Sequence, residues 1–396
     1  MRRAGERIHG RCRRSCHRTL GFALFLALAA LAATVAPPFA AATDAPPPHA
    51  PSAIIIDLVT GRVLYGKDVH HERPMASTTK IMTALLVVQR CPNLSRLITA
   101  PPRVVNESGI GLRPGERISV RQALLALMIR SAQDAGVTLA TAVAGDEEAF
   151  VAMMNAKAHS LGLDDTHYTN ACGNIPDASH HSSVYDLAGL ARLAMGNPRF
   201  RDLVWRQHAV IHWGAGRELA VRSNNLLLHW SWADGVKPGF TGPARYCLVG
   251  SGQPGLRPFI TATLGAPNRD QDARDHVALF KWASALYEEK AVVNAGDAVA
   301  GVPLAGGGEV QVAAKTTLTA VVRSDAALRP TFTLPQQFDA QPADGTVVGS
   351  VVYRTDGVRL GTVKLVVVTP PSPSPAPTGA APQAPAGTGS PAPAGD

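Results

Sequence analysis

The sequence predicts an α/β (α+β) domain over residues 52–290, followed by a small all-β domain over residues 291–368. Two observations support this fold class. Short strand patterns at 54–56 and 259–264 enclose a region of helical patterns, so we expect the strands at both ends of the domain to share one sheet. After residue 290 the chain becomes rich in Val, Thr and Gly, with the short alternating runs that are typical of β domains.

The first 42 residues have the pattern of an export signal. Seven arginines oppose a single acidic residue, Glu6, so this segment carries a net charge of +6 out of the +8 of the whole chain. An uncharged apolar run over 20–36 and the small residues at 40–42 follow, in the order of a signal core and its cleavage site. The sequence therefore predicts a periplasmic or otherwise extracytoplasmic protein. Membrane association through an uncleaved apolar segment stays open, because 17 residues nearly suffice to span a bilayer.

Patterns along the rest of the chain predict its elements in order. Residues 43–51 are rich in Ala and Pro and are expected to form an extended leader. A hairpin is expected at 54–56 and 62–65, around a turn at Thr60 and Gly61. The apolar spacing that follows predicts helices over 77–89, 120–129, 147–161, 184–196 and 276–289. Nine prolines among the 28 residues of 369–396 predict a disordered tail.

Charge and cysteine content exclude several classes of function. Outside the first 42 residues the net charge is only about +2, so no nucleic-acid partner is predicted. Two of the five cysteines lie in the export signal, and the remaining three allow at most one disulfide. Because C-x-x-C and H-E-x-x-H spacings are missing from the sequence, no metal or other cofactor is expected.

The segment S-T-T-K at 77–80 carries the first candidate chemistry. If 77–89 is a helix, the Ser77 hydroxyl lies in its first turn and the Lys80 ammonium projects from the same face. A lysine that is partly buried among apolar residues can lose its charge and accept the proton of the serine. By itself, S-x-x-K also fits a helix N-terminus with a solvated lysine, so the chemistry depends on further motifs.

Two further motifs follow in the chain: Ser131-Ala132-Gln133 and Lys237-Pro238-Gly239. Together with S-x-x-K they resemble the S-x-x-K, S-x-N and K-T-G set of penicillin-binding proteins and serine β-lactamases. The sequence around these motifs is similar to that of low-molecular-mass serine D-alanyl-D-alanine carboxypeptidases, densely over 52–290 and more loosely to 368. The resemblance implies a transpeptidase/β-lactamase-like domain with an antiparallel sheet flanked by helices.

The resemblance also implies a role for each site residue. Ser77 would attack the penultimate D-Ala carbonyl of a peptidoglycan stem pentapeptide, Lys80 would be the general base, and Ser131 would relay the proton. The terminal D-Ala would leave, and water would hydrolyse the acyl-enzyme. β-Lactam antibiotics imitate this substrate, so they would acylate Ser77. The expected substrate-binding residues are Lys237, Gln133, Gly239, Phe240, Thr241 and Arg269.

Several of these residues have a particular expected task. Lys237 would hold Ser131 and Lys80 in place and attract the substrate carboxylate, and the backbone N–H groups of Ser77 and Phe240 would form an oxyanion hole. Gly239 would let the substrate backbone approach the strand edge. Thr241 would face the same way as Gly239.

Two positions depart from the family motifs. Gln133 stands where the motif has Asn, which adds a methylene before the amide, and Pro238 stands where the motif has Thr, which removes a hydroxyl. Carboxylate recognition is therefore in question. Arg269 is the candidate arginine for it, and Arg274 stays open as an alternative.

Three other residues are expected to be structural. His180 would brace the wall behind the site, Asp186 would cap the helix that follows it, and Cys247 would be a small core residue.

Alternative functions remain open at this point. Gln133 and Pro238 also fit a degenerate penicillin-binding protein that binds wall peptides without efficient turnover. A secreted β-lactamase is disfavoured, because no E-x-x-x-N segment lies between Ser131 and Lys237 to position a deacylating water. A D,D-endopeptidase of the same fold is disfavoured by the added β domain.

Overall fold

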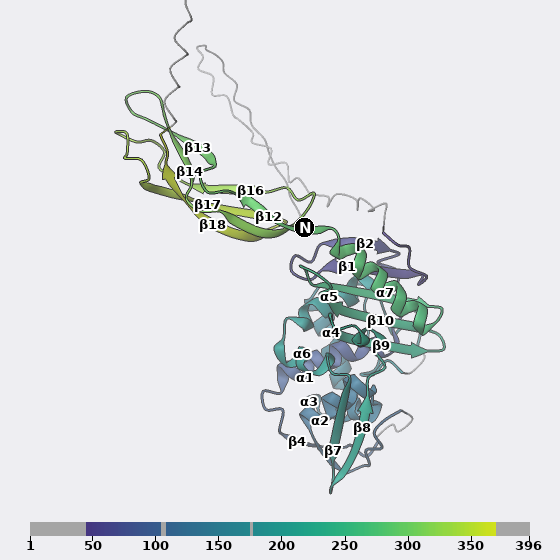
Figure 1. Ribbon diagram of the computed structural model, residues 1–396. Helices are drawn as coiled ribbons and strands as arrows, with labels where there is room; N and C mark the ends of the chain where they lie inside the picture. Colours follow the sequence, from purple (N-terminus) through teal and green to yellow (C-terminus); the bar gives the residue numbers. More distant parts are fainter. Residues whose placement is uncertain (1–44, 104–107, 175–176, 370–396) are drawn as a thin grey trace, which may run out of the picture. The chain divides into compact units, whose positions relative to one another are not determined.

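The computed structural model describes residues 45–103, 108–174 and 177–369 (Figure 1). The predicted export signal and the predicted proline-rich tail lie outside the described residues, apart from Thr369. Among the helices of the described ranges, none combines the length and apolar character needed to cross a membrane.

A five-stranded antiparallel sheet organises the first domain. Its strands are β1 (Ser52–Asp57), β2 (Val63–Lys67), β9 (Ala233–Thr241), β10 (Arg245–Gly252) and β11 (Phe259–Ala266), arranged in the order β2-β1-β11-β10-β9. β1 pairs with β11 through the register Ile54 to Ala262, so the two ends of the domain share one sheet, as the sequence predicts. The predicted hairpin is β1–β2. β9 is an edge strand, and its free edge borders the cleft described below.

The two faces of this sheet bury separate apolar clusters, because successive strand residues point to opposite faces. Ile54 and Ile56 belong to the cluster that includes Leu187 of α5 (Val184–Met195). Ile55, between them, belongs to the cluster that includes Phe280 of α7 (Arg269–Ser284). The sheet is thus covered by helices on both faces (Figure 1).

The helices between the sheet strands form the rest of the first domain. The 3₁₀ turn η1 (Ala76–Thr79) leads into α1 (Lys80–Arg90), whose residues are buried from Lys80 to Val88. A helix that is buried on every side belongs to the domain centre. The remaining helices are α2 (Val120–Leu125), the π-helical turn η2 (Ala126–Arg130), α3 (Gln133–Ala144), α4 (Glu147–Ser160), α6 (Pro198–Val204) and the 3₁₀ turn η3 (Leu226–His229).

Short strands complete this domain. β3 (Arg73–Pro74) pairs with β6 (His181–Ser182). A second small sheet has the order β4-β5-β7-β8, with strands β4 (Leu97–Thr99), β5 (Arg117–Ser119), β7 (His208–Trp213) and β8 (Arg217–Arg222).

The helix predicted over 276–289 is wrong at both ends. α7 begins at Arg269, where Asn268 caps it by accepting a hydrogen bond from the Gln271 backbone, and it ends at Ser284. Residues that the prediction assigned to its last turn belong to β12 (Tyr287–Val293). The residues Glu288, Glu289 and Lys290 are good helix formers, and strand pairing with β15 overrides that preference.

The C-terminal domain consists of β strands only within the described ranges. β12 pairs with β15 (Leu318–Arg323). The larger sheet has the order β13-β14-β18-β17-β16, with strands β13 (Ala298–Pro303), β14 (Glu309–Ala314), β16 (Arg329–Thr333), β17 (Val347–Thr355) and β18 (Val358–Val367). Its core contains Val312, Val351 and Leu365. The predicted start of this domain at 291 falls inside β12.

Candidate active site

Ser77 and Lys80 lie next to each other at the start of the central helix. Residues three apart are eclipsed in a 3₁₀ turn, so η1 aligns the two side chains. Lys80 Nζ lies 2.9 Å from Ser77 Oγ and donates a second hydrogen bond to the Cys172 carbonyl at 2.6 Å. The Lys80 side chain is fully buried, so these two oxygens hold the amine at the hydroxyl.

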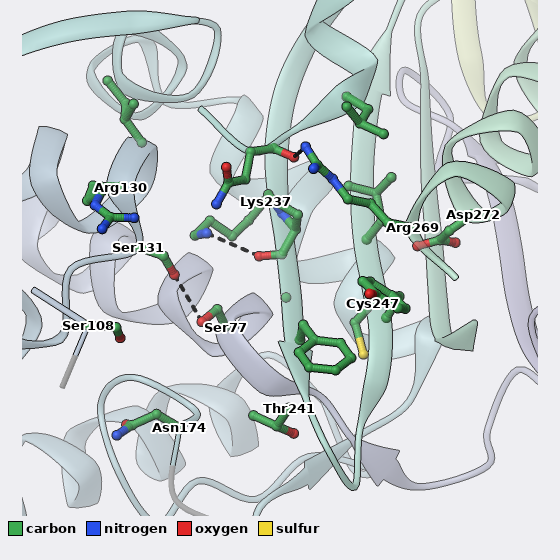
Figure 2. A pocket seen from close by; sticks show the side chains of 18 of the residues that line it. Ser77, Ser108, Arg130, Ser131, Asn174, Lys237, Thr241, Cys247, Arg269 and Asp272 are labelled. Carbon is green, nitrogen blue, oxygen red and sulfur yellow. Dashed lines mark hydrogen bonds between the residues drawn. The ribbon is translucent and has the colours of Figure 1, made fainter. Parts of the chain in front are cut away.

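Ser131 approaches the same hydroxyl from the other side. The π-helical turn η2 ends at Ser131, whose backbone is left-handed with φ 65° and ψ 29°. This sharp exit turns the side chain back, and Ser131 Oγ donates a hydrogen bond to Ser77 Oγ at 3.0 Å (Figure 2). A hydroxyl oxygen can accept two hydrogen bonds, so Ser77 Oγ lies between an amine and a second hydroxyl.

Lys237 brings a second buried amine to the site from β9. Its Nζ donates to the Pro238 carbonyl at 3.1 Å, and the side chain is almost completely buried. Burial lowers the pKa of Lys80. The pKa of Lys237 is lowered well below its ordinary value, first by burial and then by the positive charge of Lys80. Within the described ranges neither lysine forms an ion pair with a carboxylate. The site therefore favours a neutral amine beside Ser77.

These groups open into a cleft of about 460 Å³. The cleft lies between β9 on one side and the segments that carry Ser77 and Ser131 on the other (Figure 2). All nine predicted site residues except Lys80 line it: Ser77, Ser131, Gln133, Lys237, Gly239, Phe240, Thr241 and Arg269. The structure thus brings the three sequence motifs together.

Gly239 is needed for the close approach of two backbone segments. A Cβ atom at this position would lie 2.8 Å from the Ser77 nitrogen and 3.2 Å from the Thr78 nitrogen. The strand edge and the start of the central helix can only lie this close because residue 239 has no side chain. The expected approach of the substrate backbone at Gly239 stays a prediction, and the neighbour that the structure shows at this position is the protein's own backbone.

Comparisons with known proteins agree with this geometry. The family model for D-alanyl-D-alanine carboxypeptidases, peptidase S11, matches residues 40–268. The chain belongs to this family. It is a serine peptidase. A second family model, for the C-terminal domain of penicillin-binding protein 5, matches residues 287–369.

Individual relatives cover most of the chain. It is similar to D-alanyl-D-alanine carboxypeptidase DacF of Bacillus subtilis, with 28% identity over 78% of this chain and 82% of the relative. It is also 34% identical to DacB2 of Mycobacterium tuberculosis, over 63% of this chain and 88% of the relative.

Solved structures show the same fold. A crystal structure of the Streptomyces K15 DD-transpeptidase matches with 29% identity and a TM-score of 0.57, over 61% of this chain and 99% of that chain. Penicillin-binding protein 5 from Haemophilus influenzae matches with 22% identity and a TM-score of 0.61, over 81% of this chain and 97% of that chain. The fold prediction of a transpeptidase/β-lactamase-like domain followed by an all-β domain is confirmed.

The two departures from the family motifs both lie in the cleft. Gln133 is the first residue of α3, and its side-chain Oε1 accepts a hydrogen bond from Asn174 Nδ2 at 2.8 Å. Pro238 is half-buried on β9, and its carbonyl accepts the hydrogen bond from Lys237. Both residues therefore take part in the hydrogen bonding of the site.

Arg269 reaches the cleft and Arg274 does not line it. Arg269 Nη2 donates to the Asn224 carbonyl at 3.0 Å, which places the guanidinium on the β9 side of the cleft (Figure 2). Arg274 donates to the side chain of Gln271 on the same helix at 2.8 Å. Of the two arginines that the sequence left open, Arg269 is the one in the cleft.

His180 braces the start of the central helix. Its Nδ1 accepts a hydrogen bond from the Thr169 backbone at 3.0 Å, so the other ring nitrogen carries the proton and donates to Thr79 Oγ1 at 2.8 Å. Thr79 Oγ1 donates in turn to the Ala76 carbonyl. Burial lowers the pKa of His180 to about 4, which keeps the ring neutral. The predicted bracing role fits these contacts.

The cap assigned to Asp186 is wrong. Ser183 is the N-cap of α5, and its side chain accepts from the Asp186 nitrogen. Asp186 instead accepts hydrogen bonds from Thr166 Oγ1 and the Asp165 nitrogen.

Cys247 is a buried thiol on β10, and burial raises its pKa to about 12. Cys91, Cys172 and Cys247 are all free thiols.

Sequence reasoning missed several groups at the site. The Cys172 carbonyl holds Lys80, and Asn174 holds Gln133. Arg130 and Asn224 also line the cleft. A backbone carbonyl leaves no signal in the residue type, whereas the asparagine in the segment N-A-C-G-N at 170–174 could have been noted as a polar turn.

Proposed function

We propose that this chain removes the terminal D-alanine from peptidoglycan stem pentapeptides through an acyl-enzyme on Ser77. The observation that carries the proposal is the environment of Ser77 Oγ, which lies 2.9 Å from the Lys80 amine and 3.0 Å from the Ser131 hydroxyl. A serine attacks a carbonyl only if a neighbouring group accepts its proton, and a buried lysine with a lowered pKa can do so.

The acylation step follows from these contacts. Ser77 Oγ loses its proton to the neutral Nζ of Lys80 and forms a bond to the carbonyl carbon of the penultimate D-Ala. Ser131 passes its proton to the nitrogen of the departing D-Ala as the C–N bond breaks, and takes a proton in turn from the Lys80 ammonium, so that both residues return to their starting states. Water then attacks the ester carbonyl, which releases the shortened peptide and restores the Ser77 hydroxyl.

The rest of the cleft is assigned to substrate binding. The backbone N–H groups of Ser77 and Phe240 stabilise the oxyanion, and Gly239 permits that arrangement. Lys237 and Arg269 attract the free carboxylate of the substrate, and Thr241 lies further along the same strand edge. Gln133 holds the peptide on the acyl side. β-Lactams enter as mimics of the substrate and acylate Ser77.

The proposed substrate also fixes a location. Peptidoglycan lies outside the cytoplasm, and the arginine-rich segment over 1–42 has the pattern of an export signal. The domains proposed for the exported chain are a catalytic domain that begins at residue 52 and a β domain that ends at residue 368, with the boundary between them at the start of β12, residue 287, instead of the expected 291.

The test is D-alanine release from a synthetic stem pentapeptide by the purified full-length chain. Wild type releases D-alanine, and Ser77→Ala and Lys80→Met do not. A protein that is labelled by a fluorescent penicillin on Ser77 but releases no D-alanine is instead a wall-peptide binding protein, and the proposed function fails. Rapid turnover of the penicillin itself indicates a β-lactamase, which also overturns the proposal.

A further inference from the structure

Residues 170–174 form a fixed turn that ends at Asn174 in the lining of the cleft. The side-chain Oδ1 of Asn170 accepts hydrogen bonds from the backbone nitrogens of Cys172 at 3.1 Å and Gly173 at 2.6 Å. Gly173 has a left-handed backbone with φ +72°, and a Cβ atom there would lie 1.9 Å from the Ala76 carbonyl oxygen. The turn is therefore packed directly against the residue before Ser77.

This turn brings Asn174 to Gln133. Asn174 Nδ2 donates to Gln133 Oε1 at 2.8 Å, and both residues line the cleft. The backbone of Gln133 is held as well, because its nitrogen donates to the Ser108 carbonyl at 3.2 Å. Gln133 is thus held by hydrogen bonds at both its backbone nitrogen and its side-chain amide.

The hydrogen bond between the Asn174 and Gln133 amides leaves a donor group on Gln133 and an acceptor group on Asn174 available for a ligand. Gln133 Nε2 keeps its two N–H donors and Asn174 Oδ1 keeps its acceptor capacity, and within the described ranges neither atom has a hydrogen-bond partner in the protein. One donor next to one acceptor, both on the cleft wall, match the C=O and N–H of a peptide group.

We propose that Asn174 is a positioning residue that fixes the Gln133 amide, so that the pair binds the peptide group on the acyl side of the scissile bond. This inference rests on the proposed function. Gln133 has one more rotatable bond than the asparagine of the family motif, and ordering that bond costs free energy. Asn174 removes this cost in the free enzyme by holding the amide in one orientation.

The experiment compares acylation of Ser77 by two penicillins. Benzylpenicillin carries an acylamino group, which corresponds to the acyl-side peptide group, and 6-aminopenicillanic acid lacks it. The measured quantity is the second-order acylation rate constant for benzylpenicillin divided by that for 6-aminopenicillanic acid. Asn174→Ala lowers this ratio roughly three- to tenfold, as expected for one lost hydrogen bond, and leaves the rate constant for 6-aminopenicillanic acid unchanged. Asn174→Asp has the same shape but cannot donate to Gln133 Oε1, so it lowers the ratio even if the alanine variant folds poorly.

Two further variants complete the test. Gln133→Asn combined with Asn174→Ala restores the ratio, because the shorter amide does not depend on the support. Asn93→Ala, the same change at an exposed asparagine outside the cleft, leaves both rates as in wild type.

The outcomes separate this inference from the proposed function. Equal losses with both penicillins indicate that Asn174 only supports the fold, and no loss with either indicates that it does not position Gln133; both results overturn the inference. If wild type is acylated but releases no D-alanine from pentapeptide, the proposed function fails, while the ratio still tests the amide pair.

Discussion

Gly239→Ala tests how closely the strand edge must approach the nucleophile. A Cβ atom at residue 239 would lie 2.8 Å from the Ser77 nitrogen, whereas ordinary contact begins at 3.4 Å, so the two segments must separate by about 0.6 Å. The neighbouring atoms are mostly backbone, so no side-chain rotation can make the space. The Ser77 N–H is the proposed oxyanion donor, and a displacement approaching 1 Å at a reacting centre costs roughly 10²-fold in rate, or about 2.7 kcal/mol.

The assay is the second-order rate constant for acylation by benzylpenicillin, with the melting temperature measured in parallel. Gly242→Ala is the matched control, since a Cβ atom at residue 242 meets no atom within 4 Å. We expect a loss of about two orders of magnitude for Gly239→Ala and none for Gly242→Ala. A folded Gly239→Ala protein that is acylated at the wild-type rate would refute the close-approach argument.

Three further predictions concern charge. The acylation rate rises with pH with a midpoint below 10.5, because burial lowers the pKa of Lys80. Lys80→Arg removes this rise and lowers the rate at least ~10²-fold, since a guanidinium does not lose its proton. A Lys80→Arg protein with the wild-type pH profile would contradict this prediction. Arg269→Ala raises KM for a pentapeptide roughly tenfold through a lost charged contact, while Arg274→Ala does not, and steady-state kinetics on both variants decide it. The folded-state pKa of His180 is about 4, below its ordinary 6.5, so protons bind the unfolded chain first and stability falls as pH drops from 6.5 to 4. Between pH 6.5 and 4 the free energy of unfolding of His180→Gln, measured by urea unfolding, should fall by up to about 3 kcal/mol less than that of wild type. Equal falls in the two proteins would count against this prediction.

The sequence predicted the parts of the site that depend on local spacing. Ser77 and Lys80 are three residues apart at a helix start, so their proximity follows from helix geometry alone. Ser131 and Lys237 were found through motifs, and they meet Ser77 because β9 packs against η1 and η2 packs against α1. Arg269 was found by its place after the last sheet strand, and its cleft position depends on the Asn268 cap that starts α7 early.

Other parts of the site depend on tertiary contacts that no local pattern encodes. The acceptor for Lys80 is a backbone carbonyl at Cys172, which any residue could supply. The strand β12 has a helix-forming sequence and becomes a strand only by pairing with β15. The hairpin of β7 and β8 was not predicted, because most of its side chains are exposed and apolar alternation along it is weak.

The most direct test of the account is the location of the adduct formed with benzylpenicillin. Mass spectrometry of the intact chain after a short incubation should show one added penicilloyl group, and peptide mapping should place it on Ser77, with no adduct in Ser77→Ala. An adduct on another residue, or undiminished labelling of Ser77→Ala, would contradict the claim that the Lys80 amine activates the Ser77 hydroxyl for acyl transfer.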